Sequence, residues 1–394
     1  MEKIFRRSLY RKIEPYLKKP EAIIITGMRR CGKTYLLLDI FNTLSSQNKI
    51  FFDLENPLSR KVFEELNYET IKTSLEKQGL DFSAQSYVFL DEIQWLKQIP
   101  SVVKYLSDHY HIKFFLTGSA SFYLKNLFNE SLSGRKFLLE LFPLSFTEFL
   151  FFKESKFVLP EIGKKINETI WKIFEPLWNE YLNFGGFPEV VLSTNSAEKE
   201  KKLDDIFSSY FQKEILQLSD FRKNDKIRDF IVLLAENTGN LLNTERMANE
   251  LKVSRITIEE WLSFLEATYL VSLVSPYSQS SRIAIRKAKK IYFIDWAIAE
   301  KINKIDFGQK LENCVFHLLR PHGNVAYYRK KSGAELDFVL NNKIGFEVKT
   351  SAAPADAKQT KRLVKELKLK KHYIVSYNHS DLPSVIPGFA LDSL

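Results

Sequence analysis

Short runs of apolar residues, each followed by glycine, acidic or hydroxyl residues, recur through the first third of the chain. They occupy positions 22–25, 87–90 and 113–116, the last of which opens with a lysine. These runs lack the alternation of a half-exposed strand, so they predict central strands of a parallel sheet that is covered on both faces. Ligands bind beyond the carboxyl ends of such strands. The pattern therefore predicts an α/β fold with its functional residues directly after each run.

Two further patterns follow. Residues 151–192 are rich in aromatics and end in Phe-Gly-Gly-Phe-Pro at 184–188, which predicts a helical lid closing on a tight turn. Two short helices at 244–251 and 254–267, followed by a hairpin, fit a winged helix-turn-helix. Its recognition helix would offer Arg255 and Thr257 to a DNA backbone, but the acidic residues that follow would repel phosphate; these are Glu259, Glu260 and Glu266. A protein-interaction or structural module is therefore the alternative for this region.

A phosphate-binding loop is predicted directly after the first apolar run, where residues 27–34 read Gly-Met-Arg-Arg-Cys-Gly-Lys-Thr. Glycines permit backbone conformations that a side chain would block, and the loop N–H groups then converge on phosphate at a helix N-terminus. The lysine of this motif reaches the β- and γ-phosphates, and the hydroxyl ligates Mg²⁺. An accidental glycine turn is the alternative. The predicted contacts to ATP are Gly27, Arg29, Arg30, Gly32, Lys33, Thr34 and Tyr35.

The second and third apolar runs end in residues suited to ATP hydrolysis. Asp91 would hold Mg²⁺ together with Thr34, and Glu92 would orient or deprotonate the attacking water. On its own, Asp-Glu after a strand is as often the start of a polar loop. The third run leads into Thr117 and Ser119, whose hydroxyls could contact the γ-phosphate or the water. Capping of the next helix by Ser119 or Ser121 is the alternative.

The C-terminal region carries a second set of chemical residues. Segments 335–340 and 344–349 predict two strands joined by a loop at 341–343. In that register Asp337 lies across from Glu347, and Lys349 shares their face. Two carboxylates beside a lysine can form a divalent-metal site that stabilises an attacking hydroxide or a pentavalent phosphate. A solvated polar face on an exposed hairpin is the alternative.

The order of these motifs resembles that of AAA+-type P-loop ATPases carrying a C-terminal domain of unknown function 4143. The resemblance covers nearly the whole chain and implies that Arg135, in the Gly-Arg element at 134–135, is an arginine finger. It also implies that the C-terminal motif is that of PD-(D/E)XK nucleases, with Asp337, Glu347 and Lys349 as its residues. Glu312 matches a further acidic, metal-binding position of that superfamily. An exposed surface ion pair is the alternative for Arg135.

The resemblance implies a division of the chain into four parts. We expect a P-loop ATPase core at 1–150, a helical lid at 151–215, a winged-helix-like domain at 216–275 and a nuclease-like α/β domain at 276–394. Basic residues of the last part would lie on a helix that lines a substrate path; they are Lys358, Lys361, Arg362 and Lys365, beside Gln359.

The amino-acid composition indicates which kinds of partner the protein can bind. The 394 residues carry 58 Lys and Arg against 48 Asp and Glu, a formal net charge of +10, which favours an acidic partner such as nucleic acid. A lysine-rich bias without binding is the alternative. The two cysteines are too few for a disulfide framework, and we find no targeting segment or apolar run of about 18 residues. We therefore expect a cytoplasmic protein without a membrane partner.

These observations predict an ATP-binding and ATP-hydrolysing protein that uses Mg²⁺. Its nuclease-like domain would act on or bind nucleic acid, most readily DNA, with a second divalent metal at Glu312, Asp337 and Glu347. An arginine finger acting between subunits would require a homo-oligomer. The alternative is an ATP-dependent switch or scaffold whose inactive nuclease-like domain binds a protein or nucleic-acid partner.

Overall fold

The computed structural model describes residues 5–119, 134–164, 166–216, 224–278, 287–330 and 332–394. Contacts between Cα atoms divide the chain into two units. The first contains residues 1–142 together with Ala267–Tyr269, and the second contains Pro143–Glu266 and Leu270–Leu394. Among the described residues, no helix is both long enough and apolar enough to cross a membrane.

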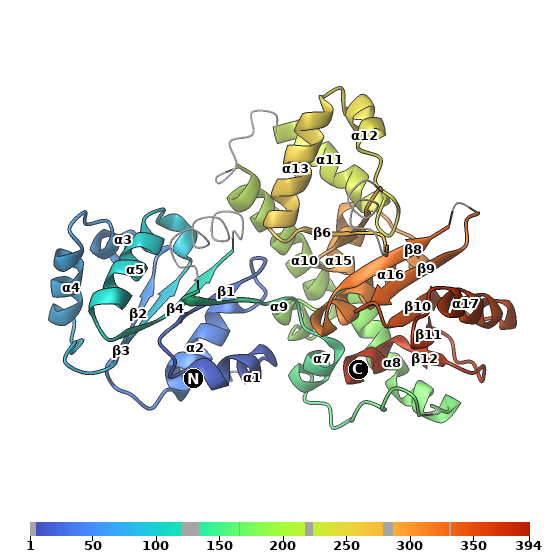
Figure 1. Ribbon diagram of the computed structural model, residues 1–394, viewed down its shortest axis with the longest axis horizontal. Helices are drawn as coiled ribbons and strands as arrows, with labels where there is room; N and C mark the ends of the chain where they lie inside the picture. The colour runs from blue at the N-terminus through green and yellow to red at the C-terminus, as the bar shows by residue number, and fades with distance from the viewer. Residues whose placement is uncertain (1–4, 120–133, 165, 217–223, 279–286, 331) are drawn as a thin grey trace. The chain divides into compact units, whose positions relative to one another are not determined.

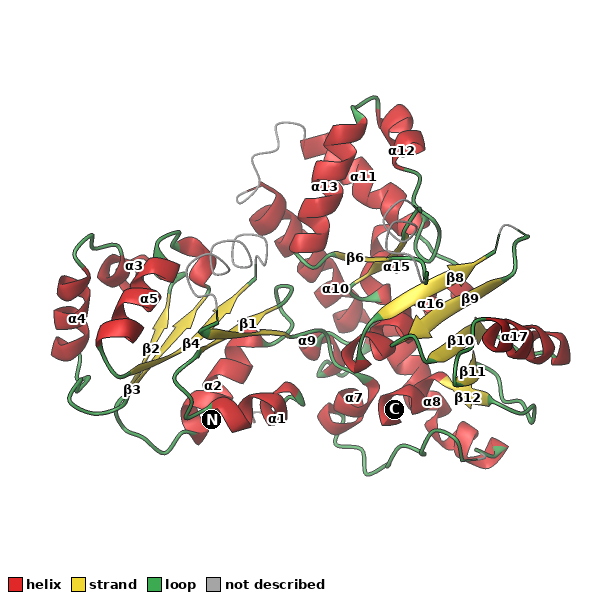
Figure 2. Ribbon diagram, viewed as in Figure 1, coloured by secondary structure: helices red, strands yellow, loops and turns green. Residues whose placement is uncertain are grey.

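The first unit is built on a five-stranded parallel sheet of order β2-β3-β4-β1-β5 (Figures 1 and 2). The strands are β1 (Ala22–Thr26), β2 (Lys49–Asp53), β3 (Ser86–Asp91), β4 (Ile112–Gly118) and β5 (Lys136–Glu140). Every residue of β1, β3 and β4 is buried, as expected for central parallel strands. The three strands predicted from the apolar runs are therefore confirmed.

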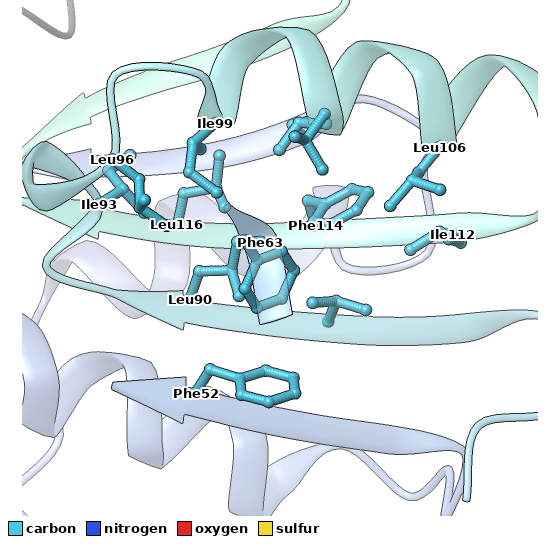
Figure 3. Close-up of a cluster of buried hydrophobic side chains, with 14 of the residues drawn as sticks. Phe52, Phe63, Leu90, Ile93, Leu96, Ile99, Leu106, Ile112, Phe114 and Leu116 are labelled. Carbon is cyan, nitrogen blue, oxygen red and sulfur yellow. The ribbon is translucent and has the colours of Figure 1, made fainter. Parts of the chain in front are cut away.

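Helices cover both faces of this sheet. They are α1 (Leu9–Ile13), α2 (Lys33–Thr43), α3 (Pro57–Phe63), α4 (Tyr68–Lys77) and α5 (Ile99–His109). Alternate strand residues point to opposite faces. Leu90 and Leu116 join Phe63 and Ile99 in the core under α3 and α5 (Figure 3). On the other face Phe89 stacks on its neighbour Phe115 and packs edge-on against Phe41 of α2.

The second unit begins with helices that the sequence assigns to the end of the ATPase core, the lid and the middle domain. They are α7 (Phe146–Phe152), α8 (Glu168–Phe184), α9 (Pro188–Val191), α10 (Ser196–Tyr210), a π-helical turn (Phe211–Leu216), α11 (Asn224–Glu236), α12 (Thr244–Leu251) and α13 (Arg255–Ala267). The predicted helices at 244–251 and 254–267 are confirmed. The antiparallel pair β6 (Val271–Val274) and β7 (Lys290–Phe293) follows them. The winged-helix assignment itself stays a prediction.

The C-terminal part of this unit contains a mixed five-stranded sheet of order β12-β11-β10-β9-β8. Its strands are β8 (Val325–Arg329), β9 (Glu335–Leu340), β10 (Ile344–Lys349), β11 (Lys371–Ser376) and β12 (Val385–Pro387); the helices are α15 (Trp296–Ile302), α16 (Phe307–Leu319) and α17 (Pro354–Glu366). Leu363 of α17 packs with Leu336 and Val339 of β9. From α16, Phe316 stacks on Phe338. The expected α/β domain with its own sheet is therefore present.

The boundaries of the two units differ in position from the predicted parts. Residues 143–150, expected in the ATPase core, and the predicted lid at 151–215 both belong to the second unit. The reason is aromatic packing, because Phe174 of α8 stacks on Phe389 near the C-terminus at 4.8 Å and Phe146 of α7 packs edge-on against Trp178. The four-part division stays a prediction.

Candidate functional site

The phosphate loop lies between β1 and α2, at the carboxyl edge of the parallel sheet. Gly27 has φ +154°, and a Cβ built on it would lie 2.2 Å from the backbone oxygen of Leu141. Gly32 has φ +92° and caps the N-terminus of α2 in the left-handed region. Both positions therefore require glycine, one for space and conformation and the other for conformation.

Lys33 is the first residue of α2, and its side chain is folded back over the loop. It is 4% exposed, and its Nζ donates to the carbonyl oxygens of Gly27 and Met28, each at 3.0 Å. The ammonium group therefore lies directly against the loop whose N–H groups would receive phosphate. Of the other predicted nucleotide contacts, Arg29 is buried, whereas Arg30, with φ +63°, and Tyr35 are exposed.

Asp91, at the end of β3, joins three neighbouring elements. It is 3% exposed, Thr34 Oγ1 of α2 donates to its Oδ2 at 2.6 Å, and Thr117 Oγ1 of β4 donates to its Oδ1. Burial raises the pKa of Asp91, while the two hydroxyl groups oppose that change. Hydroxyl and carboxylate oxygens are the hard ligands that Mg²⁺ prefers. The pair Thr34 and Asp91 therefore fits Mg²⁺ beside the phosphate loop.

Glu92 follows Asp91 in the left-handed backbone region, with φ +54°. Gln94 Nε2 donates to its carboxylate, and Arg29 Nη1 lies 3.9 Å from Glu92 Oε1. The backbone N–H of Ser119, beyond β4, donates in turn to Gln94 Oε1 at 3.3 Å. The predicted residues Glu92 and Ser119 are therefore linked through Gln94, which the sequence did not single out. Its only signal is its position two residues after the glutamate.

Arg135 lies at the opposite edge of the sheet from the phosphate loop. It precedes β5, and its carbonyl oxygen accepts from the N–H of Ala22, the first residue of β1, at 3.0 Å. One strand length, about 17 Å, separates that end of β1 from the loop. The side chain is 56% exposed and pairs with Asp108. Arg135 therefore does not reach the phosphate loop of its own chain, and its action on a neighbouring subunit stays a prediction.

The second set of predicted residues lies on β9 and β10. The observed pairs Val339↔Gly345 and Phe338↔Phe346 fix the predicted register, in which Asp337 comes opposite Glu347. There the ladder changes, because Asp337 Oδ2 accepts from the N–H of Val348 at 2.7 Å. The alignment predicted for the two strands is confirmed, whereas the side-chain hydrogen bond between them was not predicted.

Glu347 and Lys349 form an ion pair on β10. Lys349 Nζ donates to Glu347 Oε1 at 2.6 Å, while Glu347 Oε2 is buried and has no hydrogen-bond partner among the described residues. Burial, with the nearby charge of Asp337, raises the pKa of Glu347 to about 8. Burial also raises the pKa of Asp337. Lys349 opposes the rise in the pKa of Glu347 by stabilising the charged form of that carboxylate.

Three residues that the sequence did not assign to this site complete it. Glu335 lies two residues before Asp337 on β9, and Lys290 and Tyr292 come from β7. Lys290 Nζ lies 3.0 Å from Glu312 Oε1, 2.5 Å from Glu335 Oε1 and 3.8 Å from Asp337 Oδ1. Tyr292 Oη donates to Glu312 Oε1 at 2.6 Å. The sequence signal for Lys290 was its position at the start of an apolar strand. A lysine is rarely buried unless it is paired, so this position indicates an acidic partner nearby.

The charges in this cluster influence one another strongly. Burial raises the pKa of Glu312 to about 7, although Lys290 opposes the shift. Burial alone would lower the pKa of Lys290, but the surrounding carboxylates of Glu312, Asp337 and Glu335 raise it. Lys290 is therefore a permanent ammonium group held inside an acidic cluster.

The arrangement of the acidic side chains in this cluster decides whether it can hold a divalent metal ion. Within the part of the chain that the structure describes, no group of three or more His, Cys, Asp or Glu side chains is arranged to hold a metal ion. Glu312, Glu335 and Asp337 instead surround an ammonium group. In this arrangement the residues do not fit a metal ion. The assignment of Glu312, Asp337 and Glu347 as metal ligands therefore gains no support from this geometry and stays a prediction.

Comparison with known proteins gives matches over most of the chain. Residues 19–150 match the model of an AAA domain, residues 175–308 that of domain of unknown function 8612, and residues 307–388 that of domain of unknown function 4143. An uncharacterized protein of Methanocaldococcus jannaschii is 30% identical over 95% of this chain and 86% of its own length. An uncharacterized protein of Haemophilus influenzae is 27% identical, over 80% of this chain and 78% of its own.

Among solved structures, the Aeropyrum pernix ORC2 protein is similar with a TM-score of 0.42 and 14% identity, over 68% of this chain and 88% of that one. A TM-score below 0.5 adds no argument about function. The phosphate loop and Asp91 lie inside the AAA match, and the acidic strands β9 and β10 lie inside the match to domain 4143. The chain belongs to the family of AAA-type P-loop ATPases that carry a C-terminal domain of unknown function 4143.

Proposed function

We propose that this protein is an ATP-hydrolysing switch whose C-terminal domain binds nucleic acid. One observation supports ATP hydrolysis: Lys33, Thr34 and Asp91 lie together at the carboxyl edge of the parallel sheet. A cation, a hydroxyl and a carboxylate at one glycine loop supply the contacts that an ATP–Mg²⁺ complex requires.

The side chains have separate tasks in this proposal. Lys33 exchanges its bonds to the carbonyls of Gly27 and Met28 for bonds to phosphate oxygens, which neutralises charge that develops in the transition state. Thr34 and Asp91 would hold Mg²⁺, which would neutralise charge on the phosphate oxygens. Glu92 leaves Gln94 and accepts a proton from the attacking water. ATP turnover by the purified protein in Mg²⁺, compared with EDTA, tests the proposal; no turnover and no nucleotide binding would reject it.

The proposal that the C-terminal domain binds nucleic acid rests on the positive charge of α17. Its exposed face carries Lys358, Lys361, Arg362 and Lys365. Closely spaced cations on one helix neutralise the phosphates of a nucleic-acid backbone and release its counterions. The net charge of +10 supports the same partner. DNA is the partner that we propose, and binding through the backbone would be largely independent of sequence.

Reversing two charges on α17 is expected to weaken DNA binding. In the double variant Lys358→Glu with Arg362→Glu, we expect affinity for a DNA duplex to fall at least about tenfold and the salt slope of log K to decrease by about 2. Fluorescence anisotropy over a salt series measures both quantities. The matched control is Lys61→Glu with Lys77→Glu, which makes the same charge change at two exposed lysines of the first unit. Equal losses in both variants would contradict a specific role of α17.

The nuclease alternative can be separated on the same samples. Asp337, Glu347 and Lys349 do lie together, and this geometry is the observation in its favour. Plasmid, single-stranded DNA and RNA are incubated in Mg²⁺ or Mn²⁺, with and without ATP. Cleavage that disappears in Asp337→Ala would establish a metal nuclease. Binding without cleavage would support the switch.

A further inference from the structure

Strand β7 directs a lysine into the acidic cluster of the C-terminal domain. We define this cluster as Glu312 of α16, Glu335 and Asp337 of β9, and Glu347 of β10. Lys290 and Tyr292 lie two residues apart on β7, so they point to the same side of the strand. Both contact Glu312 Oε1, Lys290 through Nζ at 3.0 Å and Tyr292 through Oη at 2.6 Å.

The position of Lys290 is fixed by its surroundings. All four residues of β7 are buried, and the lysine side chain is 4% exposed. Its backbone is paired on two sides, with Val274 of β6 and, through an isolated bridge, with Leu241. Nζ also lies 5.9 Å from the centroid of the Tyr327 ring. A side chain enclosed in this way cannot swing into solvent without opening the strand.

The contacts of Nζ combine one hydrogen bond with two further ion-pair contacts. Lysine has three N–H donors and no acceptor. Its Nζ donates to Glu312 Oε1 at 3.0 Å and lies 2.5 Å from Glu335 Oε1 and 3.8 Å from Asp337 Oδ1 as an ion-pair partner. Pairing with an opposite charge offsets the cost of burying both the ammonium group and the carboxylates. Lys290 and the cluster therefore stabilise each other.

We propose that Lys290 is a built-in counter-ion that takes the position a divalent cation would need and thereby excludes metal from the C-terminal domain. Mg²⁺ requires close to six oxygen ligands at about 2.1 Å. One oxygen each of Glu312 and Glu335 lies against the ammonium group, and a second cation beside it would meet direct repulsion. The cluster thus serves as a structural link between β7, α16 and β9. This role does not depend on ATP hydrolysis.

The test is Mn²⁺ binding to the nucleotide-free protein. Isothermal titration with MnCl₂ is performed on wild type, Lys290→Met and Lys290→Met/Asp337→Asn. Methionine removes the charge at similar volume. We expect no Mn²⁺ site that depends on Asp337 in wild type, and in Lys290→Met a new site at least about tenfold tighter than any wild-type binding. The double variant should lose the new site. Mn²⁺ should also raise the melting temperature of Lys290→Met by more than it raises that of wild type, since both share the proposed site at Thr34 and Asp91.

A matched lysine controls for the loss of a buried charge. Lys199 of α10 has a side chain that is 6% exposed and pairs with Glu180, outside the cluster. Lys199→Met should be destabilised without gaining Mn²⁺ affinity. The proposal fails if Lys290→Met gains no more affinity than Lys199→Met. It also fails if wild type binds Mn²⁺ and Asp337→Asn abolishes that binding, a comparison that needs no lysine variant and holds even if Lys290→Met does not fold.

Discussion

Lys33→Ala is expected to abolish ATP turnover, with a loss of at least about a hundredfold. Lys33 is buried against the loop carbonyls, to which its Nζ donates two hydrogen bonds. Among the described residues, Arg29 is the other buried cation of the loop, but it lies beside Glu92. Without the ammonium group, negative charge that develops on the phosphates is not neutralised. Steady-state phosphate release in Mg²⁺ measures the loss.

A glutamine at position 92 should separate binding from chemistry. Glu92→Gln keeps the side-chain shape and one acceptor oxygen but cannot accept a proton, so we expect a loss of turnover of about a hundredfold with nearly unchanged ATP affinity. Lys33→Ala should weaken both. Fluorescent-nucleotide binding alongside the turnover assay distinguishes the two variants.

Lys49→Ala is the matched control for Lys33→Ala. Lys49 Nζ also donates to two backbone carbonyls, those of Phe41 at 2.7 Å and Leu44 at 2.6 Å, but near the C-terminal end of α2. Its loss should lower stability and leave turnover intact. Normal turnover by Lys33→Ala, or an equal loss in Lys49→Ala, would contradict the assignment of the phosphate loop.

Asp295→Ala is expected to lower the free energy of unfolding by about 3 kcal/mol. Asp295 is completely buried at the N-cap of α15, where it accepts from the N–H of Ala297 at 2.9 Å and from that of Gly186 at 2.7 Å. It also packs so closely on Gly185 that a Cβ there would lie 2.2 Å from Asp295 Oδ1. Alanine would leave two buried N–H groups without acceptors. Urea unfolding followed by circular dichroism measures the difference.

Asp306→Ala provides the matched comparison, because Asp306 caps the neighbouring helix α16 on the protein surface. Its Oδ1 accepts from the N–H of Gln309 at 2.8 Å. An exposed N-cap is worth about 1 kcal/mol, since water replaces the lost acceptor. Equal effects at the two positions would show that burial of the Asp295 carboxylate adds nothing.

The stability that Asp295 contributes changes with pH in a defined direction. Burial raises the pKa of Asp295 from 3.8 to about 6. Between these values the folded protein binds the proton more tightly than the unfolded chain, so the stability contributed by this group falls as the pH rises. Asp295→Asn does not titrate. The stability of wild type relative to Asp295→Asn should therefore decrease from pH 3.8 to about 6 and stay level above it.

Much of the candidate nucleotide site could be predicted because its residues are close in sequence. Gly27, Gly32, Lys33 and Thr34 lie in one loop and one helical turn, and Asp91 directly follows four apolar residues. The parallel register of β1, β3 and β4 then has to bring these strand ends together. The position of Arg135 could not be predicted, because it depends on β5 joining the sheet beside β1 with its amino end away from the loop.

Local periodicity and turn chemistry are written in the sequence, and they determined four features by themselves. These are the phosphate loop, the strands that flank it, helices α12 and α13, and the alignment of Asp337 opposite Glu347. Only the tertiary structure decided that Lys290, 47 residues before Asp337, enters the acidic cluster, and that Asp295 accepts from Gly186. Buried charges are paired across elements that are distant in the chain. Such pairs follow from how helices and strands pack, and no local pattern encodes that packing.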